Sequence, residues 1–494
     1  VLPDQKQAAF DEVQRLVDEL RADCTGFMGN PDIRTPNLDA FAAQSVVFEN
    51  HITTFPKCVP ARISLMTGRY CHTDGYRTIQ QHMRPEQPDL LGALRERGYQ
   101  AAVFGKNHCW DDARWESHLD YASHREPYGE QFAELETRCK KARDEASMGS
   151  EGDKVKHGAW HYLGDVPYFA TDELIADQAV DFLTQQRDRN RPFFLQVNLE
   201  APHPPYTVEE PYFSMYDRDR IERWPCRLPE NAPLPLRAQR ACRTGLEDDP
   251  EMAAEVQATY YGMISKVDAQ LGRVLDAIER EGLEENSIIL FWADHGDYAG
   301  QYGLGEKWDT SFADCLTRVP MVIHAPGWEG GKRVGELSDH ADLCPTLCHL
   351  LGIDPLPGMH GHDLTPTLAG EPVRDAVFSE GGHEDEMLTR AKQDIGRWML
   401  PAKAQGGHFP KTSTYYEYPD SMARARMVRT RDWKMVVRVR GGSELYDLRT
   451  DRWELCNRWD DRSLDAVKLE LYEKLAVWTL ETDTDQPFQK SVGA

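Results

Sequence analysis

Residues 57–69 read KCVPARISLMTGR, and the rest of the chain can be interpreted outward from this stretch. It follows a β-prone run over residues 46–55, and it can turn helical once Pro60 sets the first turn. Cys58 would then lie at a helix N-terminus, where unpaired backbone N–H groups and the helix dipole favour negative charge. Arg62 would face the same turn. The ordinary alternative is a half-buried structural cysteine.

The pattern Cys-x-Pro-x-Arg followed by Leu-x-Thr-Gly resembles the signature of the formylglycine-dependent sulfatases, which belong to the alkaline phosphatase superfamily. The resemblance implies that a maturation enzyme oxidises Cys58 to formylglycine, and that the hydrate of this aldehyde is the nucleophile. It also implies that Arg62 helps to bind the sulfate. Carboxylates, an amide or imidazole, two lysines and two histidines should complete the site elsewhere in the chain.

Length and composition limit the possible partners. A chain of 494 residues predicts one large core plus a smaller module. The net charge of −25 argues against nucleic acid or an anionic membrane as partner, so an anionic substrate needs a local positive site. No apolar run approaches about 18 residues, the length of a membrane span.

The cysteine pattern and the start of the chain bear on the compartment. Eleven cysteines lack metal-ligand or disulfide spacing, apart from Cys344 and Cys348 one helical turn apart, which favours reduced thiols. No signal peptide is seen, so a cytoplasmic location is favoured over a periplasmic one. The sequence leaves room for a homo-oligomer.

The N-terminal segment gives two conflicting indications. Apolar residues in 7–20 recur at helical spacing and predict a helix, whereas sulfatases have a central strand here that ends in an acidic pair. Residues 18–23, DELRAD, and residues 29–39 do match the family. The resemblance therefore assigns Asp18 and Glu19 as metal ligands. The alternative is a solvated acidic face of a helix.

A second motif follows a short predicted strand over residues 100–104, which runs into Gly105-Lys106-Asn107-His108. A strand end followed by glycine and polar groups is where open α/β sheets hold ligands. Sulfatases carry Gly-Lys-x-His at this point, so the resemblance directs Lys106 and His108 toward the sulfate. A surface turn is the alternative.

The third motif is a proline-rich segment. Residues 193–199 predict a buried strand, and residues 200–206, EAPHPPY, end it. Prolines on both sides of His203 hold the backbone extended and rigid. The family has its leaving-group histidine in a similar segment, so the resemblance assigns that place to His203. A histidine trapped in a rigid turn is the alternative.

The fourth motif follows a long amphipathic helix, predicted over residues 251–281. Residues 287–293 form a continuous apolar run, typical of a strand buried in a parallel sheet. Asp294 and His295 stand at its end, where charge is costly unless coordinated. The resemblance makes both metal ligands. Oxygen ligands favour Ca²⁺ or Mg²⁺, with Ca²⁺ preferred, while an imidazole shifts the balance toward Mn²⁺ or Zn²⁺.

The last motif is Lys307, whose family counterpart contacts the sulfate and the leaving oxygen. Beyond about residue 375 the pattern changes. Short strands are predicted over residues 426–430, 433–438 and 444–447, and a helix over residues 463–481. The long loop over residues 381–418, which carries His383, His408 and Lys411, is predicted to help form the substrate pocket.

Together, the motifs imply an α/β fold: an alkaline-phosphatase-like mixed sheet sandwiched by helices in residues 1–375, and a small C-terminal antiparallel sheet with one helix in residues 376–494. The expected metal ligands are Asp18, Glu19, Cys58, Asp294 and His295. The expected catalytic residues are Cys58, Arg62, Lys106, His108, His203 and Lys307.

The expected function is hydrolysis of a sulfate ester. The substrate is expected to be a small molecule or an oligosaccharide, with a sulfated carbohydrate favoured. In this hypothesis Asp294 takes a proton from the nucleophile, His203 or Lys307 protonates the leaving alcohol, and His108 helps to regenerate the aldehyde. Two alternatives remain: a phosphonate monoester or phosphodiester hydrolase, whose group the PHPPY stretch also resembles, and an inactive, binding-only relative. The Gly-Lys-x-His motif favours the sulfatase.

Overall fold

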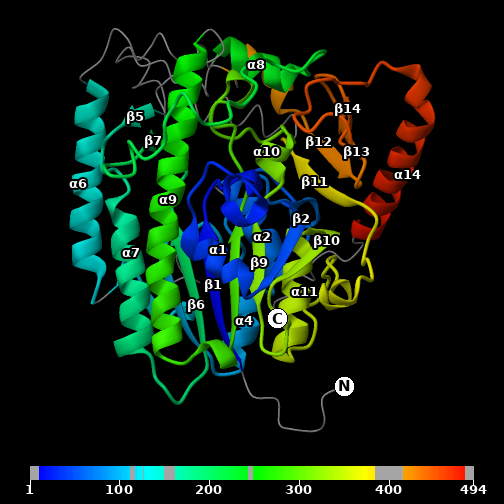
Figure 1. The fold of residues 1–494 in the computed structure, drawn as a ribbon. Helices are drawn as coiled ribbons and strands as arrows, with labels where there is room; N and C mark the ends of the chain where they lie inside the picture. Colours follow the sequence, from blue (N-terminus) through cyan, green and yellow to red (C-terminus); the bar gives the residue numbers. More distant parts are fainter. Residues whose placement is uncertain are drawn as a thin grey trace, which may run out of the picture.

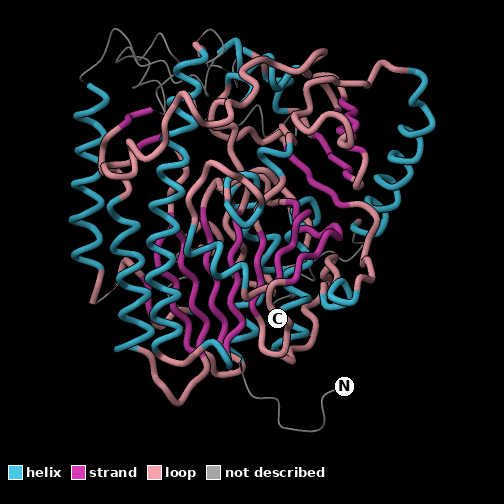
Figure 2. The backbone as a smooth tube through the Cα atoms, in the orientation of Figure 1, coloured by secondary structure: helices cyan, strands magenta, loops and turns pink. Residues whose placement is uncertain are grey.

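The computed structural model describes residues 10–79, 81–111, 117–125, 127–148, 162–242, 249–383, 414 and 417–483. A large mixed sheet has helices on both faces, and a smaller antiparallel sheet lies beside it with one long helix at the edge (Figures 1 and 2). The predicted α/β class is therefore confirmed. In the part of the chain that is described, no helix is long and apolar enough to cross a membrane.

The large sheet has eight strands in the order β10-β2-β9-β8-β1-β6-β3-β4. Neighbouring strands are parallel except where β9 pairs with β8 and with β2. The strands are β1 (Asp11–Val17), β2 (Val46–Ile52), β3 (Gln100–Gly105), β4 (Tyr121–Ala122), β6 (Phe193–Leu199), β8 (Ser287–Ala293), β9 (Met321–His324) and β10 (Lys332–Asp339).

The structure shows that the helix predicted for residues 7–20 is wrong. Residues 11–17 form β1, which pairs with β6 on one side and β8 on the other, while residues 1–9 lie outside the described part. Two complete hydrogen-bond ladders and burial on both faces outweigh the helical spacing of the apolar residues. The central strand expected from the family is thus present.

This strand buries polar side chains in its interior. Gln14 donates a hydrogen bond to Glu12 across 2.6 Å, and burial raises the pKa of Glu12 to about 8. Arg15 is fully buried, with its guanidinium 4.1 Å from the centre of the Phe41 ring, and burial lowers its pKa to about 9. These buried polar residues interrupt the apolar pattern that is typical of a buried strand, so the sequence does not predict a strand here.

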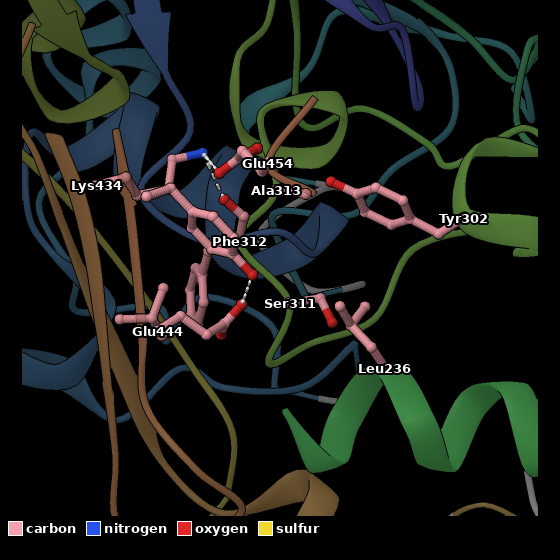
Figure 3. A pocket seen from close by; sticks show the side chains of 10 residues that line it. Leu236, Tyr302, Ser311, Phe312, Ala313, Lys434, Glu444 and Glu454 are labelled. Atoms are coloured by element: carbon pink, nitrogen blue, oxygen red, sulfur yellow. Dashed lines mark hydrogen bonds and ion pairs between the residues drawn. The ribbon is translucent and has the colours of Figure 1, made fainter. Parts of the chain in front are cut away.

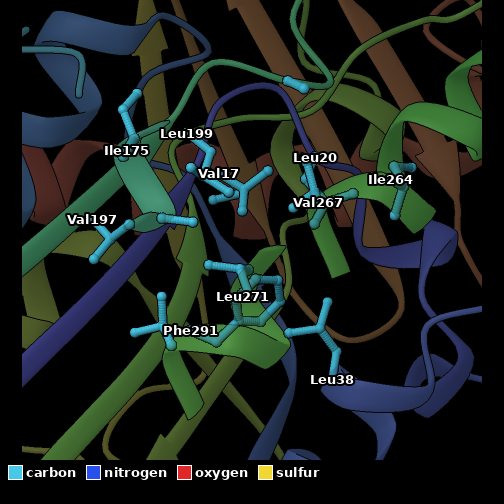
Figure 4. Packing of buried hydrophobic residues seen from close by; sticks show 14 of the residues in the cluster. Val17, Leu20, Leu38, Ile175, Val197, Leu199, Ile264, Val267, Leu271 and Phe291 are labelled. Carbon is cyan, nitrogen blue, oxygen red and sulfur yellow. The ribbon is translucent and has the colours of Figure 1, made fainter. Parts of the chain in front are cut away.

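Helices cover both faces of the large sheet (Figure 1). One face packs against α1 (Pro36–Ala43), α7 (Ala170–Asp181) and α9 (Pro250–Arg280). The other packs against α2 (Cys58–Thr67), α4 (Leu90–Glu96) and α11 (Leu343–Leu351). Figure 4 shows Val17 of β1 beside Leu199 of β6, with Leu271 of α9 in the same cluster. Each such buried side chain contributes roughly 1.5–3 kcal/mol, so this core fixes the sheet.

The remaining elements lie around this frame. They are α3 (Cys71–Asp74), α6 (Gly129–Met148), α8 (Leu234–Cys242), α10 (Asp314–Thr317) and the paired strands β5 (Tyr162–Gly164) and β7 (Tyr206–Thr207).

The smaller sheet has the order β11-β12-β13-β14, all antiparallel. Its strands are β11 (Val377–Gly381), β12 (Ala425–Arg429), β13 (Trp433–Arg438) and β14 (Glu444–Asp447), and α14 (Asp465–Thr482) packs against it. Phe378 stacks on Trp478 with 4.8 Å between the ring centres. The three predicted strands and the helix are confirmed, and β11 is an additional strand that sequence reasoning missed.

A buried lysine links the smaller sheet to the segment that precedes β9. Lys434 of β13 is fully buried, donates to the backbone oxygen of Phe312 across 2.9 Å, and lies 2.7 Å from the carboxylate of Glu454 (Figure 3). Of the predicted pocket loop, residues 384–413, with His408 and Lys411, lie outside the described residues. A role for that loop stays a prediction.

Candidate functional site

The register of the large sheet brings the motif residues to one edge. Val17 of β1 is opposite Leu199 of β6 and Ala293 of β8. Gly105 of β3 is opposite Asn198 of β6. Because these strands are parallel, the residues that follow them emerge at the same edge, where open α/β sheets bind ligands.

Cys58 is the first residue of α2, and its N-terminal position over this edge fits the sequence prediction. The thiol is buried, with Sγ 3.3 Å from Nε2 of His295 and 3.5 Å from Oδ1 of Asp18. Burial and Asp18 would raise the pKa of the Cys58 thiol, but Lys307 and His295 outweigh them and lower it. Cys58 therefore lies in a site that stabilises negative charge on its side chain.

Two cations from the motifs contact the acidic strand ends. Arg62 donates from Nε to Oδ2 of Asp294 across 3.0 Å, and its Nη2 lies 3.4 Å from Oδ2 of Asp18. Lys106 donates to the same Asp18 oxygen across 2.6 Å. Burial opposes ionisation of Asp18, yet Lys106 and Arg62 hold its pKa well below the ordinary value. Asp18 is therefore ionised at neutral pH.

A second group joins Glu19, His203 and Lys307. The Lys307 ammonium contacts the Glu19 carboxylate and lies 2.9 Å from Nε2 of His203, which is 3.0 Å from Oε1 of Glu19. Nδ1 of His203 lies 2.6 Å from the backbone oxygen of Pro204, which fixes the proton on Nδ1 when the ring is neutral. Glu19 adopts a φ of 63°, a strained value for a non-glycine residue that is frequent at functional sites.

His108 lies beside the cluster without bonding to it. Its Nδ1 is buried and has no hydrogen-bond partner among the described residues. Burial and the nearby Lys106 lower the pKa of His108 to about 2, so its ring is neutral. The neutral ring therefore adds no positive charge beside Lys106, and its Nδ1 can take part in a hydrogen bond with a bound molecule.

The donor set fits a divalent metal. Ligand atoms of Asp18, Glu19, Cys58 and His295 all lie within 4.8 Å of one another. Nδ1 of His295 lies 3.0 Å from the backbone oxygen of Gly296, which leaves Nε2 free to face this group. Oε2 of Glu19 is buried without a hydrogen-bond partner in the described part of the chain.

Asp294, which the sequence also suggests as a metal ligand, lies beside this group of four. Its Oδ1 accepts backbone N–H groups from Glu19 at 3.2 Å and from His295 at 2.9 Å, while its Oδ2 accepts from Arg62. Asp294 therefore also orders the turns that carry the neighbouring ligands. It lies next to the group of four without being one of them.

Asp297 is a site residue that sequence reasoning missed. It is fully buried, accepts a hydrogen bond from Tyr206 across 2.6 Å, and leaves Oδ2 without a partner among the described residues. With Asp18, Glu19 and Asp294 it makes four fully buried carboxylates, and the other three contact Lys106, Lys307 and Arg62. Such an excess of buried negative charge suits a dication. Its signal was the second aspartate of Asp294-His295-Gly296-Asp297.

Sequence reasoning also missed an ion pair next to Cys58. The Lys57 ammonium contacts the fully buried carboxylate of Asp309, and Nε2 of His383 lies 3.5 Å from the same carboxylate. Lys57 adjoins Cys58, and Asp309 is two residues beyond Lys307. The pair thus couples the helix that carries Cys58 to the loop that carries Lys307.

Comparison with known proteins agrees with this geometry. A family model described as Sulfatase matches residues 16–353. The chain is 27% identical over 425 residues to an arylsulfatase of Clostridium perfringens, which covers 78% of this chain and 84% of the relative.

Two solved structures share the fold. A phosphonate monoester hydrolase of Agrobacterium radiobacter has a TM-score of 0.75, 25% identity and 96% coverage of both chains. A protein solved with its substrate D-glucosamine-2-N,6-O-disulfate has a TM-score of 0.71 and 19% identity, over 98% of this chain and all of the other.

Proposed function

Because the chain belongs to the sulfatase family of the alkaline phosphatase superfamily and is a sulfuric ester hydrolase, we propose that it hydrolyses sulfated carbohydrates with formylglycine made from Cys58 and one divalent metal. One observation carries this proposal. The Cys58 thiol lies 3.3 Å from His295 and 3.5 Å from Asp18, within the cluster that also holds Arg62 and Lys106.

In this proposal a maturation enzyme oxidises Cys58, and the hydrated aldehyde supplies an oxygen nucleophile. The N-terminus of α2 favours negative charge at this position. Asp294, held by two backbone N–H groups and Arg62, is placed to accept the nucleophile's proton. Its fixed orientation reduces the reorganisation that this transfer requires.

Asp18, Glu19, Asp294 and His295 would hold the metal together with the modified Cys58. Ca²⁺ is favoured because carboxylate oxygens dominate the donor set, and the His295 imidazole keeps Mg²⁺, Mn²⁺ and Zn²⁺ as alternatives. The metal would supply positive charge opposite the sulfate group.

Two buried cations, Arg62 and Lys307, and the partly buried Lys106 would bind the sulfate. Arg62 offers a planar set of donors, while Lys106 and Lys307 act as point charges. Sulfate ester cleavage moves negative charge onto the bridging oxygen, so donors fixed around the group stabilise the transition state. The fixed ion pairs of these side chains with Asp18, Asp294 and Glu19 support that role.

The leaving alcohol would receive its proton from His203 or Lys307, which lie 2.9 Å apart. Burial and Lys307 lower the pKa of His203 well below the ordinary value, so Lys307 is the group that holds a proton at neutral pH. His108, neutral and without a bonding partner among the described residues, would then help to break down the sulfated hydrate.

The carbohydrate class rests on the shared fold with the protein solved with a glucosamine disulfate. A second candidate is a phosphonate monoester hydrolase, because the fold matches such an enzyme over 96% of the chain. Lys106 and His108 favour the sulfate ester, since two further polar groups suit a three-oxygen anion.

Mass spectrometry of the peptide that contains Cys58, run beside turnover assays with an aryl sulfate and an aryl phosphonate, tests the proposal. We expect an aldehyde mass and preferred release of sulfate. Preferred phosphonate cleavage would support the second candidate. An unmodified thiol in chain coexpressed with a maturation enzyme, together with sulfate release, would contradict the formylglycine mechanism.

A further inference from the structure

A second cationic site lies away from the residues that hold Cys58. A cavity of about 290 Å³ opens between the turn after Glu19, the segment before β9 and the smaller sheet. Its wall includes five arginines: Arg21, Arg318, Arg429, Arg431 and Arg452. In a chain with a net charge of −25, such a gathering of guanidinium groups is exceptional.

Two of these arginines have donors that no protein group uses. Within the described residues, the one hydrogen bond of the Arg318 side chain runs from Nε to the backbone oxygen of Glu49 at 2.9 Å, and no carboxylate there forms an ion pair with it. Arg429 directs Nε and Nη2 at Asp314, at 3.3 and 3.1 Å. Its Nη1 is buried without a partner in the described part of the chain. A buried donor of this kind is costly until an acceptor arrives.

The acids of the same wall are already neutralised. Asp23 pairs with Arg21 at 2.7 Å. Asp314 and Glu454, which both line the cavity, pair with the fully buried Lys434; Figure 3 shows Lys434 beside Glu454. The single charge of Lys434 offsets one of these two carboxylates, and Arg429 pairs with Asp314, so Arg318 is the one arginine of the wall without an ion pair among the described residues.

The mouth of the cavity carries the two remaining arginines. Arg431 pairs with Glu336 and Arg452 with Glu222, and both guanidinium groups are more than half exposed. Exposed ion pairs contribute little and exchange readily, so both guanidinium groups can turn to an anion. Arg452 also lies 4.4 Å above the ring of Trp453, which forms part of the wall.

We propose that this cavity binds a sulfate group, outside the catalytic site. Guanidinium donors match oxyanions in pairs, and Arg318 and Arg429 supply free donors for this geometry. The group can come from two sources: inorganic sulfate, which the hydrolysis releases, or a second sulfate on a larger sulfated sugar. Trp453 gives the latter an apolar wall for a sugar ring. The binding site itself does not depend on formylglycine chemistry.

The cavity also adjoins the catalytic loop. Gly296, next to His295, donates its backbone N–H to Leu316 across 2.8 Å, and a side chain at Gly296 would collide with the backbone oxygen of Cys315. Cys315 is part of the cavity wall, as is Arg21, three residues after Asp18. An anion in the cavity thus borders both segments that carry acidic ligands.

Isothermal titration calorimetry with sodium sulfate and with sucrose octasulfate, at ionic strength matched with sodium chloride, tests this site. Lys106→Gln weakens the catalytic anion site, so we expect binding to persist in that variant. Adding Arg318→Gln to it should weaken binding at least tenfold. Arg220→Gln, at an exposed arginine elsewhere, is the matched control and should leave binding unchanged.

Arg452→Gln lies at an exposed position and should weaken binding several-fold without disturbing the fold, which circular dichroism verifies. Sulfate binding alone would identify a product site, and tighter binding of the octasulfate a substrate subsite. Three outcomes would overturn the proposal. Binding could be equal with and without Arg318→Gln, all binding could be lost in Lys106→Gln, or neither probe could bind. Activity on an aryl sulfate tests the catalytic proposal separately.

Discussion

Arg62 Nε lies 3.0 Å from Oδ2 of Asp294, and both side chains are buried. The contact ties the second turn of the helix that starts at Cys58 to the end of β8. The same guanidinium reaches Asp18 at the end of β1, so a single side chain links the nucleophile helix to both acidic strand ends.

Replacing Arg62 by lysine should therefore cost activity although the charge is kept. A lysine offers one point charge and cannot reach Asp18 and Asp294 in one plane. We expect kcat/KM for an aryl sulfate to fall roughly 100- to 1,000-fold. Arg69→Lys, beside the same helix but paired with Asp74, is the control. If the Arg62→Lys variant is about as active as the chain without substitutions, Arg62 has no role in the transition state.

Cys58→Ser should abolish turnover while the fold remains intact. The side chain is buried but small, and serine keeps its size and its contact with Asp18. Turnover, circular dichroism and the thermal midpoint would be measured in parallel. Cys456→Ser, at an exposed cysteine, should have the same turnover and stability as the chain without substitutions. Full turnover by the serine variant would mean that Cys58 is not the source of the nucleophile.

Removing divalent metal should destabilise the chain. Asp18, Glu19, Asp294 and Asp297 are all fully buried, and a dication relieves their repulsion. Metal at 100 times its dissociation constant should add about 2.7 kcal/mol to the free energy of unfolding. Thermal melts after chelation and after adding back Ca²⁺ measure the effect.

Asp18→Asn should reduce the stabilisation by metal, because the group of four possible ligands then loses one negative charge. Asp32→Asn, at a partly buried aspartate outside the group, is the control. Equal stabilisation of all three chains by Ca²⁺ would exclude a structural metal at this site.

Asp309→Asn should lower both stability and turnover. It leaves the Lys57 ammonium buried beside a neutral amide, and breaking a buried ion pair costs roughly 3–5 kcal/mol. The double variant Lys57→Met/Asp309→Asn should recover most of the lost stability. Turnover should recover less, because the link between the Cys58 helix and the Lys307 loop stays broken. Additive losses in a double-mutant cycle would show that the two residues act separately.

The polar interior of β1 predicts a pH-dependent stability. The pKa of Glu12 is raised to about 8 from a reference of 4.5, so the folded chain keeps a proton that the unfolded chain releases between those values. Stability should therefore fall as pH rises through this interval. Glu12→Gln should remove the dependence and raise the free energy of unfolding by roughly 1–3 kcal/mol at pH 8.

Urea midpoints at pH 5 and pH 8 measure this effect, with Glu279→Gln as the control at an exposed glutamate. An equal midpoint shift for Glu12→Gln at both pH values would mean that its carboxyl group is already ionised in the folded chain.

The motifs predicted the site better than the periodicity predicted the fold near it. Lys106 and Asp294 were found because each follows a predicted strand and matches a family motif, and parallel register brings these strand ends together. Asp18 was found from the family match alone, in a stretch whose spacing predicted a helix.

Asp297 was missed although it stands in the motif that begins at Asp294, and Asp309 was missed because nothing in the sequence around it marks a buried carboxylate. Only the fold shows that both are buried, with Asp297 bonded to Tyr206 and Asp309 paired with Lys57.

The first strand shows why local patterns fail. In residues 11–17 the apolar residues are spaced as in a helix, and several side chains are charged. The segment is nevertheless a strand, because it pairs by backbone hydrogen bonds with β6 on one side and β8 on the other. Those partners lie about 180 and 275 residues further along the chain. Interactions at that separation cannot be read from a short window of sequence.

Cys58 is buried by residues that lie far along the chain, and this limits when its side chain can be modified during synthesis. The thiol is 2% exposed in the completed fold, and His295, which lies against it, follows a strand that the ribosome finishes only near residue 293. Until then, the nascent chain cannot close the pocket over Cys58. If this cysteine is converted to formylglycine as proposed, the modifying enzyme has to act in that interval, while the segment is still open.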